Sequence, residues 1–363
     1  MATSIQKCTW PRSDNNMRGI ISASIFGLFG RFSSTIIQTE NGQLEGLENE
    51  DYTVFYKIPY AKPPIDDLRF KKPESPENWT GTRDATNGDY PRCIQGSDTD
   101  DEDCLFLNVF TPNTENSELL PVMLWIHGGA WFQGSGNSGT YNGHELVQHG
   151  VIVVTIQYRL GALGFLYSDD GGAVGNQGIW DMMASLNWVN KNIENFGGDK
   201  NKVTIFGESA GGQSVSTLLA IREVENREKL FSQGIIQSDP FGIPYQTVDQ
   251  AETEAEQFMD RLGCVVEMPS YNIFNWDCAL KANTSEIIRA QHRTHRRFDT
   301  DLWSSVTEPW TPTIDGDLLD GHALKGLREG RSWKKNVIIG HTSAEGEGFV
   351  YPIQDGFART SRK

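Results

Sequence analysis

Short runs of apolar residues without polar alternation recur along the middle and the end of the chain. Continuous runs of this length are typical of β-strands that are buried on both faces. Two earlier stretches, 35–46 and 54–61, also predict strands. The apolar runs cover residues 105–110, 122–126, 151–157, 203–206, 234–237 and 337–339.

One segment between these runs has a clear helical period. In residues 179–196, apolar side chains recur every three or four positions, which places them on one face of a helix. Strands that alternate with helices predict an α/β protein with a mostly parallel central sheet and helices on both faces. Ligand sites in such sheets form at the carboxyl ends of the strands.

The charge of the chain narrows the choice of partners. The 363 residues carry a net charge of −16, which disfavours nucleic acid and anionic membranes. No stretch approaches the ~20 apolar residues of a membrane-spanning helix, so we expect no stable membrane insertion.

The N-terminal residues 1–34 differ from the rest of the chain and are interpreted as an extension. Within them, residues 17–30 combine a basic start with an apolar run of signal-peptide length. Because this run begins 16 residues after Met1, an extension without a targeting role is the alternative.

Cysteines and glycosylation motifs bear on the cellular compartment. Five cysteines form two locally spaced pairs, with Cys8 left over. The sequons at Asn78 and Asn283 favour a glycoprotein that is secreted or held in the endoplasmic reticulum lumen, where disulfides persist. The alternative is a cytoplasmic protein with buried free thiols. The pairs are Cys93 with Cys104 and Cys264 with Cys278.

Residues 207–211 fit the pattern G-x-S-x-G directly after an apolar run. In a nucleophile elbow of this kind, a strained turn between strand and helix presents the hydroxyl of the serine, here Ser209. The N–H group of Ala210 would face an oxyanion that forms at this hydroxyl.

A second glycine-rich turn, His127-Gly128-Gly129-Ala130, follows the apolar run 122–126. Glycines allow the backbone to approach a reacting carbonyl closely. The N–H groups of Gly129 and Ala130 can therefore complete an oxyanion hole together with Ala210.

Several sequence blocks, in order and spacing, resemble the type-B carboxylesterase and cholinesterase family of α/β-hydrolases. The resemblance runs from residue 35 to 351 and implies one hydrolase domain over this range. It also implies that Ser209 is the acyl-accepting nucleophile. The blocks are residues 58–64, 68–70, 102–109, 127–131, 158–166, 175–181 and 195–212.

The resemblance also assigns the acid of a catalytic triad and several structural pairs. Glu345, in the segment Gly340-His-Thr-Ser-Ala-Glu-Gly346, takes the acid position, and Glu347 is the competing candidate. The structural pairs that it implies are the ion pairs Arg69–Glu102 and Arg159–Asp181 and the disulfides Cys93–Cys104 and Cys264–Cys278.

The general-base histidine of the family follows the acid, but no histidine follows Glu345 in this chain. The tail 352–363 also loses the apolar pattern. We therefore expect an incomplete hydrolase domain that lacks its C-terminal part and has weak or no activity. His292, His295 or His341 could replace the base only in an unusual geometry.

The sequence thus predicts a serine carboxylesterase that acts on small carboxylic esters through an acyl-enzyme. The short loop 94–103 lacks the tryptophan that binds choline in cholinesterases, which favours general esters. A non-catalytic, cholinesterase-like binding or adhesion protein, or a truncated isoform, is the alternative. The Cys and His spacing predicts no metal site, and no motif predicts an organic cofactor.

Overall fold

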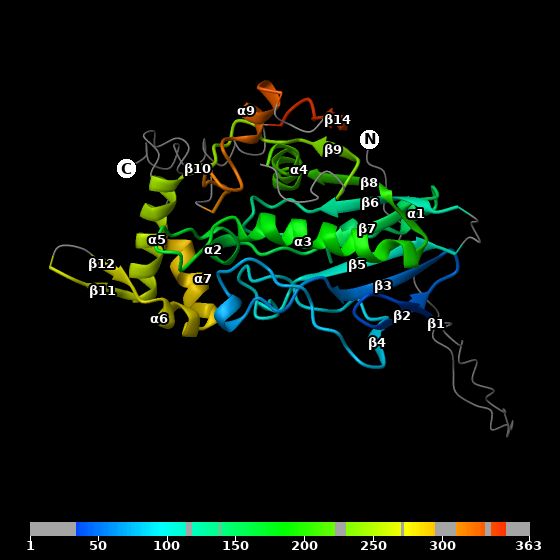
Figure 1. Ribbon diagram of the computed structural model, residues 1–363, viewed down its shortest axis with the longest axis horizontal. Helices are drawn as coiled ribbons and strands as arrows, with labels where there is room; N and C mark the ends of the chain where they lie inside the picture. Colours follow the sequence, from blue (N-terminus) through cyan, green and yellow to red (C-terminus); the bar gives the residue numbers. More distant parts are fainter. Residues whose placement is uncertain are drawn as a thin grey trace, which may run out of the picture. The chain divides into compact units, whose positions relative to one another are not determined.

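The computed structural model in Figure 1 describes most of the chain between residues 34 and 345, all of it within one unit, Ser33–Lys363. The possible signal 17–30 and the tail 352–363 lie outside the described residues. The described ranges are 34–113, 118–137, 139–221, 230–269, 272–294, 310–330 and 335–345.

A ten-stranded sheet runs through this unit in the order β1-β2-β3-β5-β7-β6-β8-β9-β14, with β4 paired to β2. Its strands are β1 (Ser34–Gln38), β2 (Gln43–Glu48), β3 (Tyr52–Pro59), β4 (Thr82–Ala85), β5 (Phe106–Pro112), β6 (Leu120–Ile126), β7 (Ile152–Ile156), β8 (Gly198–Glu208), β9 (Gln233–Gln237) and β14 (Asn336–Gly340).

The sheet is mixed, with its parallel part between β7 and β14. Strands β7, β6, β8, β9 and β14 pair in parallel, whereas β1, β2, β3, β5 and β7 pair antiparallel. All five residues of β7 are buried, as the continuous apolar run predicts. The alternating burial of β1 is typical of an antiparallel strand with one face toward solvent.

Helices α3 and α4 position the residues that follow the parallel strands. The predicted helix 179–196 is α3, which tightens into the short helix η3 over its last turn. Helix α4 packs against β8 and β9. Their bounds are α3 (Gln177–Asn192), η3 (Ile193–Phe196) and α4 (Ala210–Ala220), and the shorter helices are η1 (Asp66–Leu68), η2 (Gly139–Tyr141), α1 (His144–Val147), α2 (Gly161–Phe165) and α9 (Ala323–Arg328).

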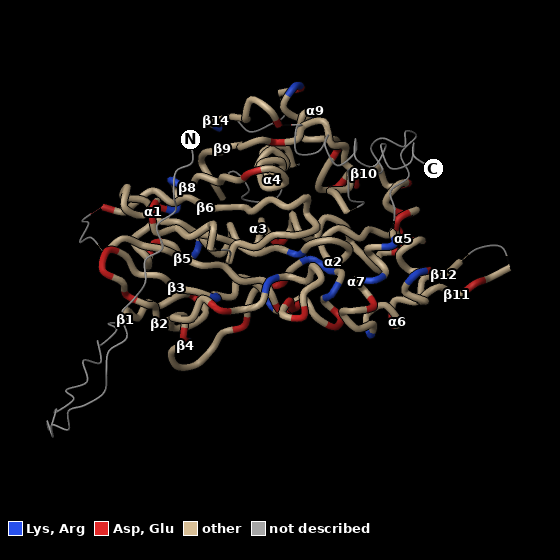
Figure 2. Tube along the Cα trace, turned by 180° about the vertical axis from the view of Figure 1, so that it is seen from behind, with Lys and Arg blue, Asp and Glu red and all other residues tan. Residues whose placement is uncertain are grey.

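Helices α5, α6 and α7 gather with the β11–β12 hairpin at one end of the sheet, at left in Figure 1 and at right in the reverse view of Figure 2. The disulfide Cys264–Cys278 joins the end of α5 to α6. These elements are α5 (Val248–Leu262), β11 (Val265–Glu267), β12 (Asn272–Phe274), α6 (Trp276–Lys281) and α7 (Thr284–Arg293), and a two-stranded parallel pair is formed by β10 (Gln246–Thr247) and β13 (Thr313–Ile314).

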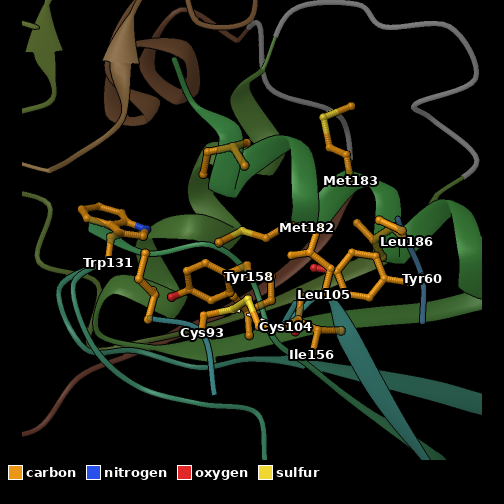
Figure 3. Packing of buried hydrophobic residues seen from close by; sticks show 14 of the residues in the cluster. Tyr60, Cys93, Cys104, Leu105, Trp131, Ile156, Tyr158, Met182, Met183 and Leu186 are labelled. Carbon is orange, nitrogen blue, oxygen red and sulfur yellow. Dashed lines mark hydrogen bonds between the residues drawn. A yellow bond between two sulfur atoms is a disulfide. The ribbon is translucent and has the colours of Figure 1, made fainter. Parts of the chain in front are cut away.

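The second disulfide, Cys93–Cys104, belongs to the main hydrophobic core. Both cysteines are buried, with exposed fractions of 2% and 1%. Figure 3 shows the bridge next to Tyr158, among side chains from the sheet and from α3. The loop between Cys93 and Cys104 is therefore anchored in the core at both ends.

Two buried ion pairs tie loops to the helices. Arg159 and Asp181 form two charge-assisted hydrogen bonds of 2.8 and 2.7 Å, and the Arg159 backbone N–H also donates to Asp181. Arg69 pairs with Glu102 and donates to three carbonyl groups at the end of α6. Both pairs that the family resemblance implies are formed.

Strand β14 differs from the sequence prediction. The apolar run 337–339 predicts a strand that is buried on both faces, yet Ile338 and Ile339 are 65% and 58% exposed. The reason is position, because β14 is the last strand of the sheet and pairs only with β9 among the described residues. The apolar pattern alone does not distinguish an edge strand from a central one.

Acidic residues outnumber basic ones in the chain, with 48 Asp and Glu against 32 Lys and Arg. Figure 2 shows Asp and Glu positions spread over loops, sheet and helices, with fewer Lys and Arg between them. Among the described helices, none has the length and apolar character to cross a membrane.

We expect Asp181→Asn to lower the free energy of unfolding by about 3–5 kcal/mol, because it leaves the buried Arg159 guanidinium without its carboxylate. Urea unfolding followed by circular dichroism measures this loss. The matched control is Glu194→Gln, which breaks the exposed pair with Lys200 and should change stability by less than about 1 kcal/mol. Equal losses in both variants would contradict the structural role of the buried pair.

Candidate active site

The register of the parallel strands brings four strand ends to one edge of the sheet. Ile126 at the end of β6 lies beside Gly207 near the end of β8. The last residue of β8 pairs with Gln237 of β9, and Gln237 pairs with Gly340 of β14. The segments after these ends carry the glycine-rich turn, Ser209 and Glu345, so the predicted site residues converge on this edge.

Ser209 occupies a sharp turn between β8 and α4. Its backbone angles, φ 57° and ψ −125°, lie outside the regions that L-residues prefer, and its N–H donates to Gln237 O at 3.0 Å. A Cβ atom at Gly211 would lie 2.1 Å from Ile126 O, so glycine is required where α4 crosses β6. The sequence pattern predicts this elbow correctly in its backbone form.

The glycine-rich turn lies directly beside the elbow. A Cβ atom at Gly128 would lie 2.6 Å from Glu208 O and 3.1 Å from Ser209 Cβ. Ala130 has a positive φ of 57°, which turns the backbone back after Gly129. The close approach explains why glycine follows His127 here.

The backbone N–H groups of this region are available to a ligand. Those of Gly129, Ala130 and Ala210 have no hydrogen-bond acceptor among the described residues. Ala210 is also the first residue of α4, where the helix dipole favours negative charge. This arrangement can stabilise an oxyanion that forms next to Ser209.

Glu345 is held at the same edge by the segment after β9. The hydroxyl of Ser238 donates to Glu345 Oε1 at 2.7 Å, and the N–H of Thr342 donates to the same oxygen. These hydrogen bonds lower the pKa of Glu345, with His341 adding a smaller effect. The carboxylate is therefore ionised at neutral pH. Its competitor Glu347 lies outside the described residues.

Glu208, next to Ser209, has the opposite electrostatic environment. Burial raises its pKa, and the nearby charge of Glu345 raises it further. The charges of the two carboxylates thus interact across the site. The pKa of Glu208 is raised, whereas that of Glu345 is lowered.

No hydrogen bond joins a described histidine to Ser209. His127 is fully buried, stacks on Tyr158 and has its pKa lowered to about 4 by burial. His341 contacts Thr342 O, and His292 packs against the ring of Phe132. His295, which the sequence offers as a further candidate, lies outside the described residues.

Comparison with known proteins identifies the family. The model of the carboxylesterase family matches residues 33–363. The chain belongs to the carboxylesterase family. Its backbone also superposes on a solved PNB esterase with a TM-score of 0.78 at 36% identity, covering 87% of this chain and 65% of that one.

Curated relatives in the carboxylesterase family agree with this assignment. The para-nitrobenzyl esterase of Bacillus subtilis is 36% identical over 88% of this chain and 65% of its own length. Gut esterase 1 of Caenorhabditis elegans is 35% identical over 91% of this chain and 57% of its own length. The chain therefore spans less than two thirds of these relatives.

Three residues in segments beside this site escaped the sequence analysis. Ser238 and Asp239 follow β9, where Ser238 donates to Glu345 and Asp239 accepts a hydrogen bond from Ser216 of α4. Gln95 binds the end of the glycine-rich turn. Ser238 could have been found, because it follows a predicted strand at the edge where ligand sites form. The other two are recognised only from their contacts.

In the ranges that the structure describes, no three His, Cys, Asp or Glu side chains come together as a metal ion would require. The polar groups at the edge are backbone N–H groups, hydroxyls and two carboxylates, which suit acyl transfer.

We expect Asp239→Asn to raise stability increasingly as pH rises. Burial raises the pKa of Asp239 to about 6, while its hydrogen bond from Ser216 opposes this shift. The folded wild type therefore binds this proton more tightly than the unfolded chain, and its contribution to stability is lost from about pH 4 to pH 6.

The measurement is the difference in the free energy of unfolding between Asp239→Asn and wild type, by urea titration from pH 4 to pH 7. The difference should grow by about 1–2 kcal/mol after allowance for solvent exposure. A difference that stays constant over this range would show that Asp239 titrates normally.

Proposed function

We propose that the chain is a serine hydrolase of carboxylic esters with Ser209 as its nucleophile. The observation that carries this proposal is the position of Ser209, on a strained elbow beside a turn whose Gly129 and Ala130 N–H groups have no acceptor among the described residues. Membership in the carboxylesterase family and the esterase relatives support the same reaction.

The proposed reaction begins with attack of Ser209 Oγ on the ester carbonyl carbon. The negative charge on the carbonyl oxygen would be stabilised by the N–H groups of Gly129, Ala130 and Ala210. Collapse of the tetrahedral intermediate releases the alcohol and leaves an acyl-serine, which water hydrolyses to the free acid. In a complete triad of this kind, Glu345 would orient a histidine that takes the proton of Ser209 Oγ and gives it to the leaving alcohol.

We further propose that these 363 residues alone react slowly. No histidine follows Glu345, and no described histidine hydrogen-bonds to Ser209. Without a base the serine hydroxyl stays protonated, and loss of one triad member lowers kcat on the order of 10⁴- to 10⁶-fold.

The proposed substrates are small, general carboxylic esters. The loop between Cys93 and Cys104 contains no aromatic residue for cation–π binding of choline. Two of the relatives are named para-nitrobenzyl esterase and gut esterase 1, and neither name refers to choline esters. A net charge of −16 disfavours nucleic acid and anionic membranes as further partners.

We also propose that residues 35–351 form the hydrolase domain and that it resides in an oxidising compartment, secreted or within the endoplasmic reticulum lumen. Two disulfides support this assignment. The sequon residues Asn78 and Asn283 are both exposed, as glycosylation requires.

The test is active-site labelling with a fluorophosphonate, followed by peptide mass mapping and a p-nitrophenyl acetate assay on the same sample. We expect slow labelling at Ser209, abolished in Ser209→Ala, and ester turnover at least about 10⁴-fold below that of a hydrolase with a complete triad. Circular dichroism and thermal unfolding confirm that both proteins are folded.

Two outcomes would contradict the proposal. A folded wild type that is not labelled above Ser209→Ala would exclude Ser209 as nucleophile and favour a non-catalytic binding protein. Fast turnover would instead show that a histidine of this chain reaches the serine. His341→Ala and His292→Ala would then identify that residue.

A further inference from the structure

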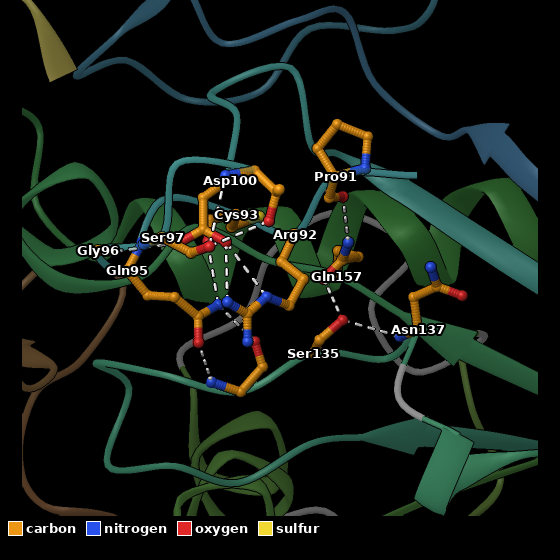
Figure 4. Close-up of polar contacts among 12 residues, drawn as sticks. Pro91, Arg92, Cys93, Gln95, Gly96, Ser97, Asp100, Ser135, Asn137 and Gln157 are labelled. Atoms are coloured by element: carbon orange, nitrogen blue, oxygen red, sulfur yellow. Dashed lines mark hydrogen bonds and ion pairs between the residues drawn. The ribbon is translucent and has the colours of Figure 1, made fainter. Parts of the chain in front are cut away.

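A glutamine from a distant loop binds the end of the glycine-rich turn. Gln95 Oε1 accepts the N–H of Gly134 at 2.9 Å, and Gln95 Nε2 donates to Gly134 O at 2.9 Å. Figure 4 shows Gln95 among its partners. One side-chain amide thus satisfies both backbone groups of a residue 39 positions away in the sequence.

Gly134 lies against the start of the same turn. Its φ is +114°, and a Cβ atom there would lie 2.4 Å from Gly128 O and 2.4 Å from His127 Nδ1. The turn also closes on itself, because Phe132 and Gln133 donate to Gly129 O at 3.0 Å. A displacement of Gly134 therefore moves the peptides that carry the oxyanion N–H groups.

Gln95 is itself held by a buried carboxylate. The Asp100 side chain is fully buried, and its Oδ2 accepts the N–H groups of Gln95, Gly96 and Ser97 at 3.1, 3.0 and 2.8 Å. Its Oδ1 pairs with Arg92. These contacts fix the backbone from which the Gln95 amide extends (Figure 4).

Other hydrogen bonds hold the turn at other points along it, including one from the N–H of Gly161, which donates to Trp131 O at 2.8 Å. Tyr158 donates to His127 O at 2.8 Å, and the indole of Trp131 donates to Ser214 of α4 at 2.9 Å. They hold the beginning and the middle of the turn. The end of the turn, at Gly134, is held by Gln95.

We propose that Gln95 is a positioning residue for the oxyanion turn, Gly128–Gly134, and that Asp100 acts on the turn through Gln95. The inference deepens the proposed function, since it rests on the role assigned to Gly129 and Ala130. It assigns a catalytic consequence to the loop 94–103, which the sequence analysis uses only as an argument about substrate preference.

Hydrogen exchange tests the geometry independently of any activity. In Gln95→Met, which retains the length of the side chain without its hydrogen bonds, the hydrogen-bonded amides of Phe132, Gln133 and Gly134 should exchange on the order of tenfold faster. Asp100→Asn should act in the same direction. The double variant should add little to Gln95→Met, because both act on the turn by one route.

The matched control is Gln43→Met, which removes a glutamine amide that accepts a hydrogen bond from Thr82 at a distant surface site. It should leave exchange in residues 128–134 unchanged. Thermal midpoints of all variants separate a local effect from general destabilisation.

The catalytic arm is the rate of fluorophosphonate labelling at Ser209, with the split between kcat and KM for p-nitrophenyl acetate where turnover is measurable. Gln95→Met should label about 10- to 100-fold more slowly and lower kcat at unchanged KM, as expected for misplaced oxyanion donors. A merely structural residue would lower the thermal midpoint instead.

The two proposals fail in different ways. A wild type that is not labelled overturns the function, while exchange still decides the contact between Gln95 and the turn. Unchanged exchange in residues 128–134 of Gln95→Met, or faster exchange with an unchanged labelling rate in an active wild type, overturns the positioning role.

Discussion

The close approach of backbone segments around Ser209 is the constraint on which the site depends. The serine adopts a strained conformation that costs on the order of 1–3 kcal/mol, and only surrounding contacts can maintain it. Those contacts need bare backbone, since a Cβ atom at Gly207 would lie 2.6 Å from Ile126 O and one at Gly128 would lie 2.6 Å from Glu208 O. Strand pairing on both sides of β8 holds the backbone in this arrangement.

Buried charge connects this edge to the rest of the unit. Arg159 follows β7 and binds Asp181 on α3, so the loop after one parallel strand is fixed to the helix behind it. Arg69 reaches the carbonyl groups at the end of α6 while it pairs with Glu102 beside the Cys93–Cys104 loop. Each guanidinium therefore links segments that are distant in the sequence. Such pairs contribute through specific geometry, because their desolvation offsets much of their Coulomb energy.

The sequence predicted the parallel strands, helix α3 and the elbow because each depends on local pattern. A strained serine between glycines and a continuous apolar run carry their structural meaning in a few neighbouring residues. Gln95 and the exposed Ile338 are features that a local sequence pattern does not predict. The amide of Gln95 pairs with a residue 39 positions away, and the exposure of Ile338 depends on its place in the strand order. Both properties belong to the assembled fold, which a local pattern does not encode.

The two carboxylates at the edge, Glu345 and Glu208, have pKa values that shift in opposite directions. Hydrogen bonds from Ser238 and Thr342 favour the ionised form of Glu345, whereas burial and the Glu345 charge disfavour ionisation of Glu208. The two environments therefore favour Glu345 over Glu208 as the carrier of a fixed negative charge. An ionised carboxylate of this kind stabilises an imidazolium next to a serine nucleophile. In the proposed reaction, the N–H groups of Gly129, Ala130 and Ala210 would face the negative oxyanion. The positive imidazolium and the negative oxyanion would thus be stabilised at different places along this edge.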